Sequence, residues 1–221
     1  MLKKAKQEFQ FHTSSDLVRL TGEKASNLKE LLEGLGKVSG ASIFHHTHHA
    51  FREHHFTDGL YFNDFAYWVR NSLNEDSLSE RLASIDIYEH LGMRSLRQEM
   101  IRMISGHLAQ KRRLQNAPAG EEFHFCDSMS IIIATGRIVR TLEEFEQALK
   151  DISSRSLYYH FFPARIRLKK KTNDFSAWIE DSLDNPKLAR RINEIDLYIN
   201  TIREIRKKII SLVEEELNAH S

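Results

Sequence analysis

Residues 42–50 read Ser-Ile-Phe-His-His-Thr-His-His-Ala, and residues 156–164 read Ser-Leu-Tyr-Tyr-His-Phe-Phe-Pro-Ala. The second stretch repeats the pattern of the first after 114 positions, and the two share the histidines His46 and His160. A repeat at a fixed offset predicts two copies of one structural unit. The chain should therefore fold as two similar halves, each organised around one histidine segment.

The repeat extends over most of the chain. At the same offset the aligned residues include Phe9 and Phe11 with Phe123 and Phe125, Thr21 with Thr135, and Leu28 with Leu142. Beyond residue 50 the offset becomes 110, and it aligns Asn63-Asp64-Phe65 with Asn173-Asp174-Phe175, Trp68 with Trp178, and Ile85-Asp86 with Ile195-Asp196. This density predicts an internal duplication, with repeats at residues 9–115 and 121–218. Residues 116–120, which contain a proline and a glycine, are the predicted linker.

Helix signals dominate each repeat. Asn27 precedes Glu30 by three residues, and Thr141 precedes Glu144 by the same spacing, which is typical of a helix N-terminus. Ser39 and Ser153 are expected to cap the histidine segments, and the Asn-Asp pairs at positions 63 and 173 are expected to cap the next helices. Asp86 also stands three residues before a glutamate, so capping is the simpler role for it and for Asp64.

Strand signals are fewer. Phe-x-Phe alternation at residues 9–11 and 123–125, and the apolar run at residues 130–135, predict short strands. We therefore expect a mainly α fold with a few short β-strands, built as two similar halves related by a pseudo-two-fold axis.

Composition restricts the class of protein. The chain has 221 residues, of which 41% are hydrophobic and 29% charged, as in ordinary globular proteins. A net charge of +1 argues against a nucleic-acid partner, and no apolar run is long enough to span a membrane. The single cysteine, Cys126, cannot form an intramolecular disulfide, which favours a cytoplasmic location.

Six of the twelve histidines lie between His45 and His55, and imidazole is the commonest metal ligand in proteins. On a helix, His45 and His49 would be one turn apart and could bind one ion. The candidate metal ligands are His45, His46, His48, His49, Asp64 and Asp86. No cofactor is expected; the alternative is a divalent metal such as zinc. A polar helix face with incidental metal affinity explains the same pattern.

The shared histidines and tryptophans are the candidate ligand-binding residues: His46, His160, Trp68 and Trp178. Each also has a structural interpretation. A buried histidine satisfied by a hydrogen bond would be retained in both copies, and an indole at helical spacing beside a phenylalanine is usually part of a core. The structural role is the favoured interpretation for all four.

The motifs resemble a known family. Phe-x-Phe, Thr-Gly, Ser-x-Tyr-Tyr-His-Phe, Asn-Asp-Phe-x-x-Trp and Ile-Asp-x-Tyr together are similar to an uncharacterised bacterial family of unknown function in which tandem copies are usual. The resemblance covers nearly the whole chain and implies a bacterial cytoplasmic protein. It carries no catalytic residue to this chain, and the histidine-rich segment 45–55 departs from the second copy.

These observations favour a non-enzymatic helical binding or regulatory module. No glycine-rich phosphate loop, Rossmann fingerprint or nucleophile elbow is present, so the enzymes that need them are excluded. The partner should be a protein or a small molecule, with no membrane partner and with homo-oligomerisation left open. The alternative is a metal-dependent hydrolase that uses the histidines of segment 45–55, with Asp64 or Asp86 as a further ligand or base.

Overall fold

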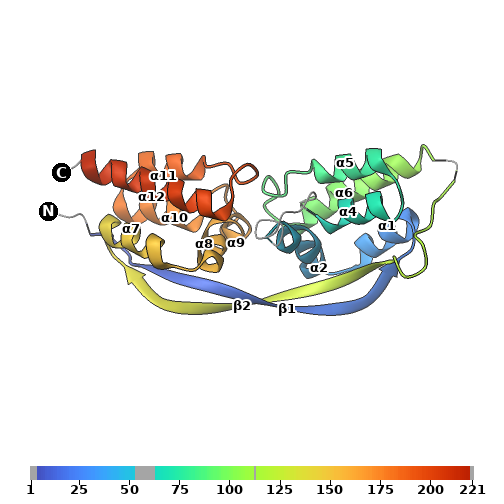
Figure 1. Ribbon diagram of the computed structural model, residues 1–221, viewed down its shortest axis with the longest axis horizontal. Coiled ribbons are helices and arrows are strands. Elements are labelled where there is room, and N and C mark those ends of the chain that lie inside the picture. Colours follow the sequence, from blue (N-terminus) through green and yellow to red (C-terminus); the bar gives the residue numbers. More distant parts are fainter. Residues whose placement is uncertain (1–3, 53–62, 112, 220–221) are drawn as a thin grey trace. The chain divides into compact units, whose positions relative to one another are not determined.

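The computed structural model describes residues 4–52, 63–111 and 113–219. Helices make up most of the structure of these residues, and two strands pair as one antiparallel sheet (Figure 1). The predicted mainly α fold is therefore confirmed. The strands are longer than expected, because β1 (Phe9–Ala25) and β2 (Phe123–Val139) each have 17 residues.

The sequence predicted two short strands where β2 runs without a break. Phe123 and Phe125 alternate with polar residues because one face of this part of β2 is covered by helices. From Met129 to Ile138 every side chain of β2 is exposed, so no buried face imposes an alternating pattern. Gly136 adopts a positive φ of 78° within the same strand, a conformation that glycine adopts without strain.

The chain divides into two compact units. Unit 1 combines Met1–Ser15 with Ser130–Ser221, and unit 2 is Asp16–Met129. Strand β1 thus begins in unit 1 and ends in unit 2, whereas β2 begins in unit 2 and ends in unit 1. The units do not coincide with the sequence repeats at 9–115 and 121–218. Unit 2 contains the first part of β2, which belongs to the second repeat, and unit 1 contains the first part of β1, which belongs to the first repeat. The repeat ranges themselves stay a prediction.

In unit 2 the helices cover one face of the strand segments (Figure 1). They are α1 (Leu28–Lys37), α2 (Gly40–Phe44), the π-helix η1 (His45–His49), α4 (Asp64–Asn71), α5 (Asp76–Ala83) and α6 (Met93–Leu108). Phe123 and Phe125 of β2 are buried beneath these helices. Helix α6 packs against α1, α2 and α5, so it connects the helices of this unit into one core.

Unit 1 repeats this arrangement with its own helices (Figure 1). They are α7 (Leu142–Asp151), α8 (Ser154–Phe161), α9 (Ala164–Leu168), α10 (Asp174–Leu183), α11 (Pro186–Asn193) and α12 (Ile202–Ala219). Phe9 and Phe11 of β1 are buried beneath them. None of the helices described in either unit is both long enough and apolar enough to cross a membrane.

The predicted helix starts are confirmed. Asn27 accepts hydrogen bonds from the amides of Lys29 and Glu30, and Thr141 accepts one from Glu144. The Glu30 carboxylate in turn accepts a hydrogen bond from the backbone amide of Ser26, 2.7 Å away. The segments with the shared histidines likewise begin at side-chain caps, which are Ser39 and Ser153.

Candidate functional site

The histidine segment of unit 2 is not a regular α-helix. Helix α2 changes into the π-helix η1 at His45, and the hydroxyl of Thr47 donates to the carbonyl of Ile43, 2.6 Å away. A π-helical turn widens the backbone ring and is frequent at functional sites. The ring centroids of His45 and His49, at the two ends of this π-helix, lie 4.8 Å apart.

His46 is buried, with 4% of its surface exposed, and both of its ring nitrogens are bonded. Its Nε2 accepts the backbone N–H of Cys126 at 2.9 Å, so Nδ1 carries the hydrogen. Nδ1 then donates to Oδ2 of Asp64 at 2.8 Å. Asp64 is held at the first position of α4, because Asn63 caps that helix. His46 therefore joins a helix start to strand β2.

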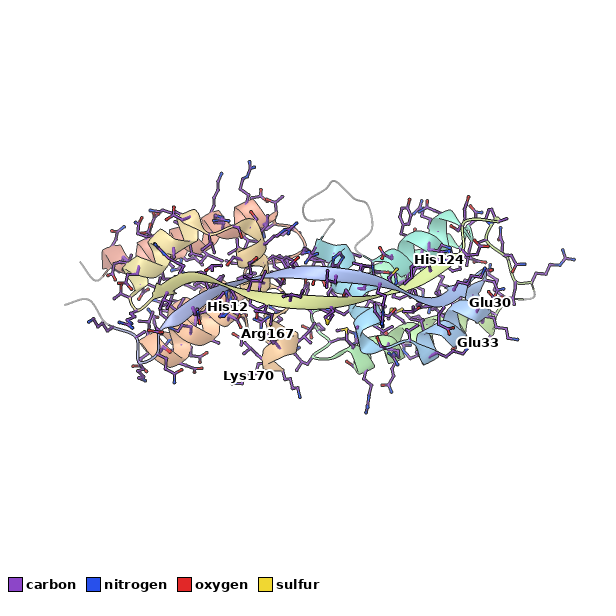
Figure 2. All side chains as sticks on the ribbon, turned by 90° about the horizontal axis from the view of Figure 1, so that it is seen from below. His12, Glu30, Glu33, His124, Arg167 and Lys170 are labelled. Carbon is purple, nitrogen blue, oxygen red and sulfur yellow. The ribbon has the colours of Figure 1, made fainter. Side chains whose placement is uncertain are left out.

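His160 has the same arrangement in unit 1. Its Nε2 accepts the backbone N–H of His12 at 2.8 Å, and its Nδ1 donates to Asp174 at 2.7 Å. Figure 2 labels His12 where β1 runs along the helices of unit 1, and Arg167 on α9. The guanidinium of Arg167 also donates to Asp174. Burial lowers the pKa of His160, and the hydrogen bond to Asp174 opposes that shift.

Aromatic rings surround both histidines. The centroid of His46 lies 4.7 Å from that of Phe123 and 5.4 Å from that of Phe65. The centroid of His160 lies 4.9 Å from that of Phe9 and 5.5 Å from that of Phe175. Each imidazole is thus a core residue whose polar atoms are satisfied, which agrees with the structural interpretation of the sequence.

Trp68 and Trp178 also join helices to the chain just before a strand. Nε1 of Trp68 donates to the carbonyl of Glu121 at 2.6 Å, and Nε1 of Trp178 donates to that of Gln7 at 2.8 Å. Both indoles are buried, so neither presents a face on which a ligand could stack in this structure. Their geometry is that of core tryptophans with a bonded N–H.

The other predicted metal ligands do not gather at one point. His48 faces the core, where its ring stacks on Phe44 at 5.1 Å and meets Tyr88 edge-on at 5.5 Å. Complete burial lowers its pKa to about 3. Asp86 accepts the amide of Tyr88 at 2.9 Å, a local turn contact. Nε2 of His49 lies 3.9 Å from Oδ2 of Asp16, a residue that the sequence did not single out.

Three potential ligands do come together in unit 2. His45, His46 and Cys126 each place a ligand atom within 4.8 Å of the other two. The sequence did not indicate this group, because Cys126 lies 80 positions after His46. Burial, followed by the neighbours His46 and His49, lowers the pKa of His45 to about 4. Burial raises the pKa of the Cys126 thiol, so Cys126 is not an activated nucleophile.

Comparison with known proteins identifies a family that matches the chain and a solved structure with a similar fold. Residues 6–214 match a family described as "Family of unknown function (DUF5752)". The solved structure described as "The structure of OrfY from Thermoproteus tenax" shares 31% sequence identity with this chain, with 96% of each chain covered and a TM-score of 0.79. No curated protein matches the sequence. Membership of a family of unknown function is therefore confirmed, while the bacterial origin, the motifs and the tandem organisation stay predictions.

Proposed function

The chain belongs to the family of unknown function DUF5752, and we propose that it is a non-enzymatic module that binds another polypeptide along its exposed strand segments. The proposal keeps the binding or regulatory role expected from the sequence and assigns it a surface. One observation carries it, which is the set of large apolar side chains that β1 and β2 expose to solvent.

Each unit has such side chains of its own. In unit 1 they are Ile131, Ile132, Ile133 and Ile138, and in unit 2 they are Leu17, Val18, Leu20 and Met129. All eight are between 45% and 67% exposed. Successive side chains of a strand point to opposite faces, so the three consecutive isoleucines place apolar surface on both faces of β2. Covering such a surface is favourable by about 25 cal/mol for each Å² removed from water.

The strand backbone defines the chemistry of the partner. Within the described residues the sheet contains two strands, so each strand has one edge without a neighbouring strand. Residues 128–136 contain no charged side chain. An exposed, apolar and uncharged strand edge is a template for strand addition. The partner we propose is therefore an extended segment of another protein with apolar side chains and little charge.

The bonding of the shared histidines supports a non-enzymatic role. A general acid or base needs a nitrogen that can reach a substrate proton. In both His46 and His160, Nδ1 donates a hydrogen bond to a carboxylate and Nε2 accepts one from a backbone amide. Both rings are also buried. The residues with the most obvious catalytic potential are thus used to hold strands against helices.

A peptide experiment tests the proposal. The probe is a short fluorescent peptide of alternating valine and threonine, a sequence not taken from this chain, with an uncharged polyethylene glycol tail for solubility, and its binding is followed by fluorescence anisotropy. We expect saturable binding that Ile132→Lys weakens by about tenfold or more, equivalent to about 1.4 kcal/mol. Ile199→Lys is the matched control, because Ile199 is an exposed isoleucine of unit 1 that lies outside the strands.

Two outcomes would contradict the proposal. One is the absence of saturable binding, or an equal loss in both variants. The other is a stable dimer in light scattering that Ile132→Lys converts to monomer, because a second copy would then occupy the surface. Either result would leave the strand segments without a separate polypeptide partner.

We also propose that the chain arose by internal duplication. The paired contacts support this proposal, because each unit contains one histidine between an aspartate at a helix start and a strand amide. The tryptophan bonds to Glu121 and Gln7 are matched in the same way. Expression of residues 16–129 as a fragment, described in the Discussion, tests whether unit 2 folds independently.

A metal-dependent hydrolase is the second candidate, favoured by the group of His45, His46 and Cys126. It ranks lower because the carboxylates expected to assist are engaged elsewhere. Asp64 accepts from His46, and Asp86 accepts a backbone amide. Hydrolysis of a model ester or phosphate by metal-loaded protein, abolished by Cys126→Ser, would move this candidate to first place.

A further inference from the structure

We propose that His45, His46 and Cys126 bind one thiophilic divalent metal ion, of the zinc class, in unit 2. The proposal concerns a binding site and assigns no reaction, so it stands independently of the polypeptide surface proposed above. It also differs from the ligand set suggested by the sequence, since a sulfur ligand from β2 replaces the carboxylates. Zinc in proteins is held mainly by cysteine sulfur and histidine nitrogen.

His45 supplies the first indication. Among the residues that the structure describes, its Nδ1 is one of the few buried polar atoms with no hydrogen-bond partner. A buried nitrogen without a partner is unfavourable, and native proteins rarely leave one unless it has a role. The neighbouring rings of His46 and His49, each with its centroid 4.8 Å away, place further imidazole groups beside it.

His46 supplies a ligand that is already oriented. Its Nδ1–H donates to Asp64, which leaves the lone pair of Nε2 directed at Cys126. A histidine that ligates zinc almost always donates its other N–H to a carboxylate or carbonyl, and this contact fixes the ring and increases its basicity. On metal binding, Nε2 would exchange the amide of Cys126 for the ion.

Cys126 supplies the sulfur. Among the described residues, the hydrogen-bond partner of its Sγ is the carbonyl of His124, at a long 3.7 Å, so a metal would displace no strong interaction of the sulfur. The ligand is the thiolate, so binding releases the thiol proton to water as the metal–sulfur bond forms.

The three ligand atoms have to move closer together to bind one ion. A tetrahedral site places nitrogen and sulfur ligands about 3.6 Å apart. The three ligand atoms now lie within 4.8 Å, so the side chains must approach by about 1 Å, which changes in side-chain torsion supply. Three protein ligands leave a fourth position for water, as in open zinc sites.

Unit 1 is the internal comparison. It keeps the bonds of His160 to Asp174 and to a strand amide, but Tyr159 stands where unit 2 has His45, and His12 stands where it has Cys126. The guanidinium of Arg167 lies 4.2 Å from the centre of the Tyr159 ring and also donates to Asp174. A fixed positive charge beside the histidine disfavours a second cation, so we expect one ion in each chain.

Cobalt(II) titration of untagged, chelator-treated protein tests the site. We expect one cobalt ion for each chain, with the visible bands of tetrahedral cobalt and a near-ultraviolet band from thiolate to cobalt. Cys126→Ser should abolish the thiolate band, and His45→Gln should weaken cobalt binding at least tenfold. His124→Gln is the control, because His124 is an exposed histidine two residues from Cys126 (Figure 2).

The readouts remain decisive if a variant folds poorly. The thiolate band is measured on the wild-type protein, and zinc chloride should displace the cobalt and raise the melting temperature. No thiolate band in the wild-type protein would overturn the proposal. A band that persists in Cys126→Ser, or binding that His124→Gln reduces as much as His45→Gln does, would overturn it as well.

Discussion

Nε2 of His46 accepts the backbone N–H of Cys126, a residue 80 positions further along the chain. The same ring donates to Asp64, so one imidazole fixes the position of strand β2 against η1 and α4. In unit 1, His160 connects His12 to Asp174 in the same manner. Hydrogen bonds of this kind hold together segments that are distant in sequence, and their removal has a measurable effect.

We expect His46→Ala to lower the free energy of unfolding by about 2–4 kcal/mol, because it creates a cavity and leaves the Cys126 amide unpaired. Asp64→Ala and the double variant complete a cycle whose coupling energy should be about 0.5–3 kcal/mol. Urea denaturation followed by circular dichroism measures these values. His124→Ala, at an exposed position of the same strand, should change stability by less than about 0.5 kcal/mol. Additive effects of the two single substitutions would contradict the direct link.

A glycine in α1 tests the packing of the helix on β2. A Cβ added to Gly34 would lie 2.4 Å from Cε2 of Phe125 and 2.5 Å from its Cζ. We expect Gly34→Ala to destabilise the protein by about 1–3 kcal/mol, because the buried ring has to move. A Cβ added to Gly36 meets nothing within 4 Å, so Gly36→Ala should stabilise the same helix by about 0.5–1 kcal/mol. Thermal melting distinguishes the two, and effects of the same sign would refute the packing argument.

Burial of His48 predicts a loss of stability in mild acid. Its pKa is lowered to about 3 in the folded protein, whereas an unfolded histidine titrates near about 6.5. Between these values the unfolded chain binds a proton that the folded chain excludes. The contribution of neutral, buried His48 to the free energy of unfolding is therefore fully present above about pH 6.5. Below that pH the free energy of unfolding falls by up to about 1.4 kcal/mol for each pH unit. His45, with a pKa of about 4, acts in the same direction over a narrower range.

Urea denaturation at several pH values measures this slope. His48→Gln should reduce the slope of the free energy of unfolding against pH by the amount that one bound proton contributes. His124→Gln, which alters an exposed histidine, should leave this slope unchanged. An equal slope in wild-type protein and His48→Gln would show that His48 does not cause the acid sensitivity.

The exchange of strands between units predicts which fragments fold. A fragment of residues 16–129 contains the complete unit 2, including Phe123, Phe125 and the Cys126 amide. A fragment of residues 9–115, which follows the sequence repeat, lacks all three. We expect the first fragment to show a cooperative thermal transition and the second to lack one. Equal folding of both would mean that β2 is dispensable for the core of unit 2.

Local signals in the sequence predicted the helix starts well. Caps such as Asn27, Thr141 and Ser39 depend on side chains within three residues of the helix start, so the chain itself contains the information. Strand length was predicted less well, because the exposed middle of β2 has no alternating pattern to mark it as a strand. The sequence also offered no sign of the π-helical turn at His45–His49.

The candidate site was predicted only in part. The shared histidines stood out through the repeat and were expected to be satisfied by hydrogen bonds, which the structure shows to Asp64 and Asp174. The approach of Cys126 to His45 was not foreseeable, because it depends on which repeat a strand packs against. The sequence places Phe123 and Cys126 in the second repeat, whereas the structure groups them in unit 2 with the helices of the first repeat.

Strand exchange also orders events during synthesis on the ribosome. Chains emerge from the N-terminus, and domains fold as their residues become available. Unit 2 has all its residues once Met129 has emerged, whereas Phe9 and Phe11 must wait for helices α7 to α10. The strand made first, β1, thus completes its packing late, because its residues 9–15 wait for helices that are made after it. During that interval its segment is exposed to other nascent chains and to chaperones, and the speed of translation through residues 130–183 sets how long the exposure lasts.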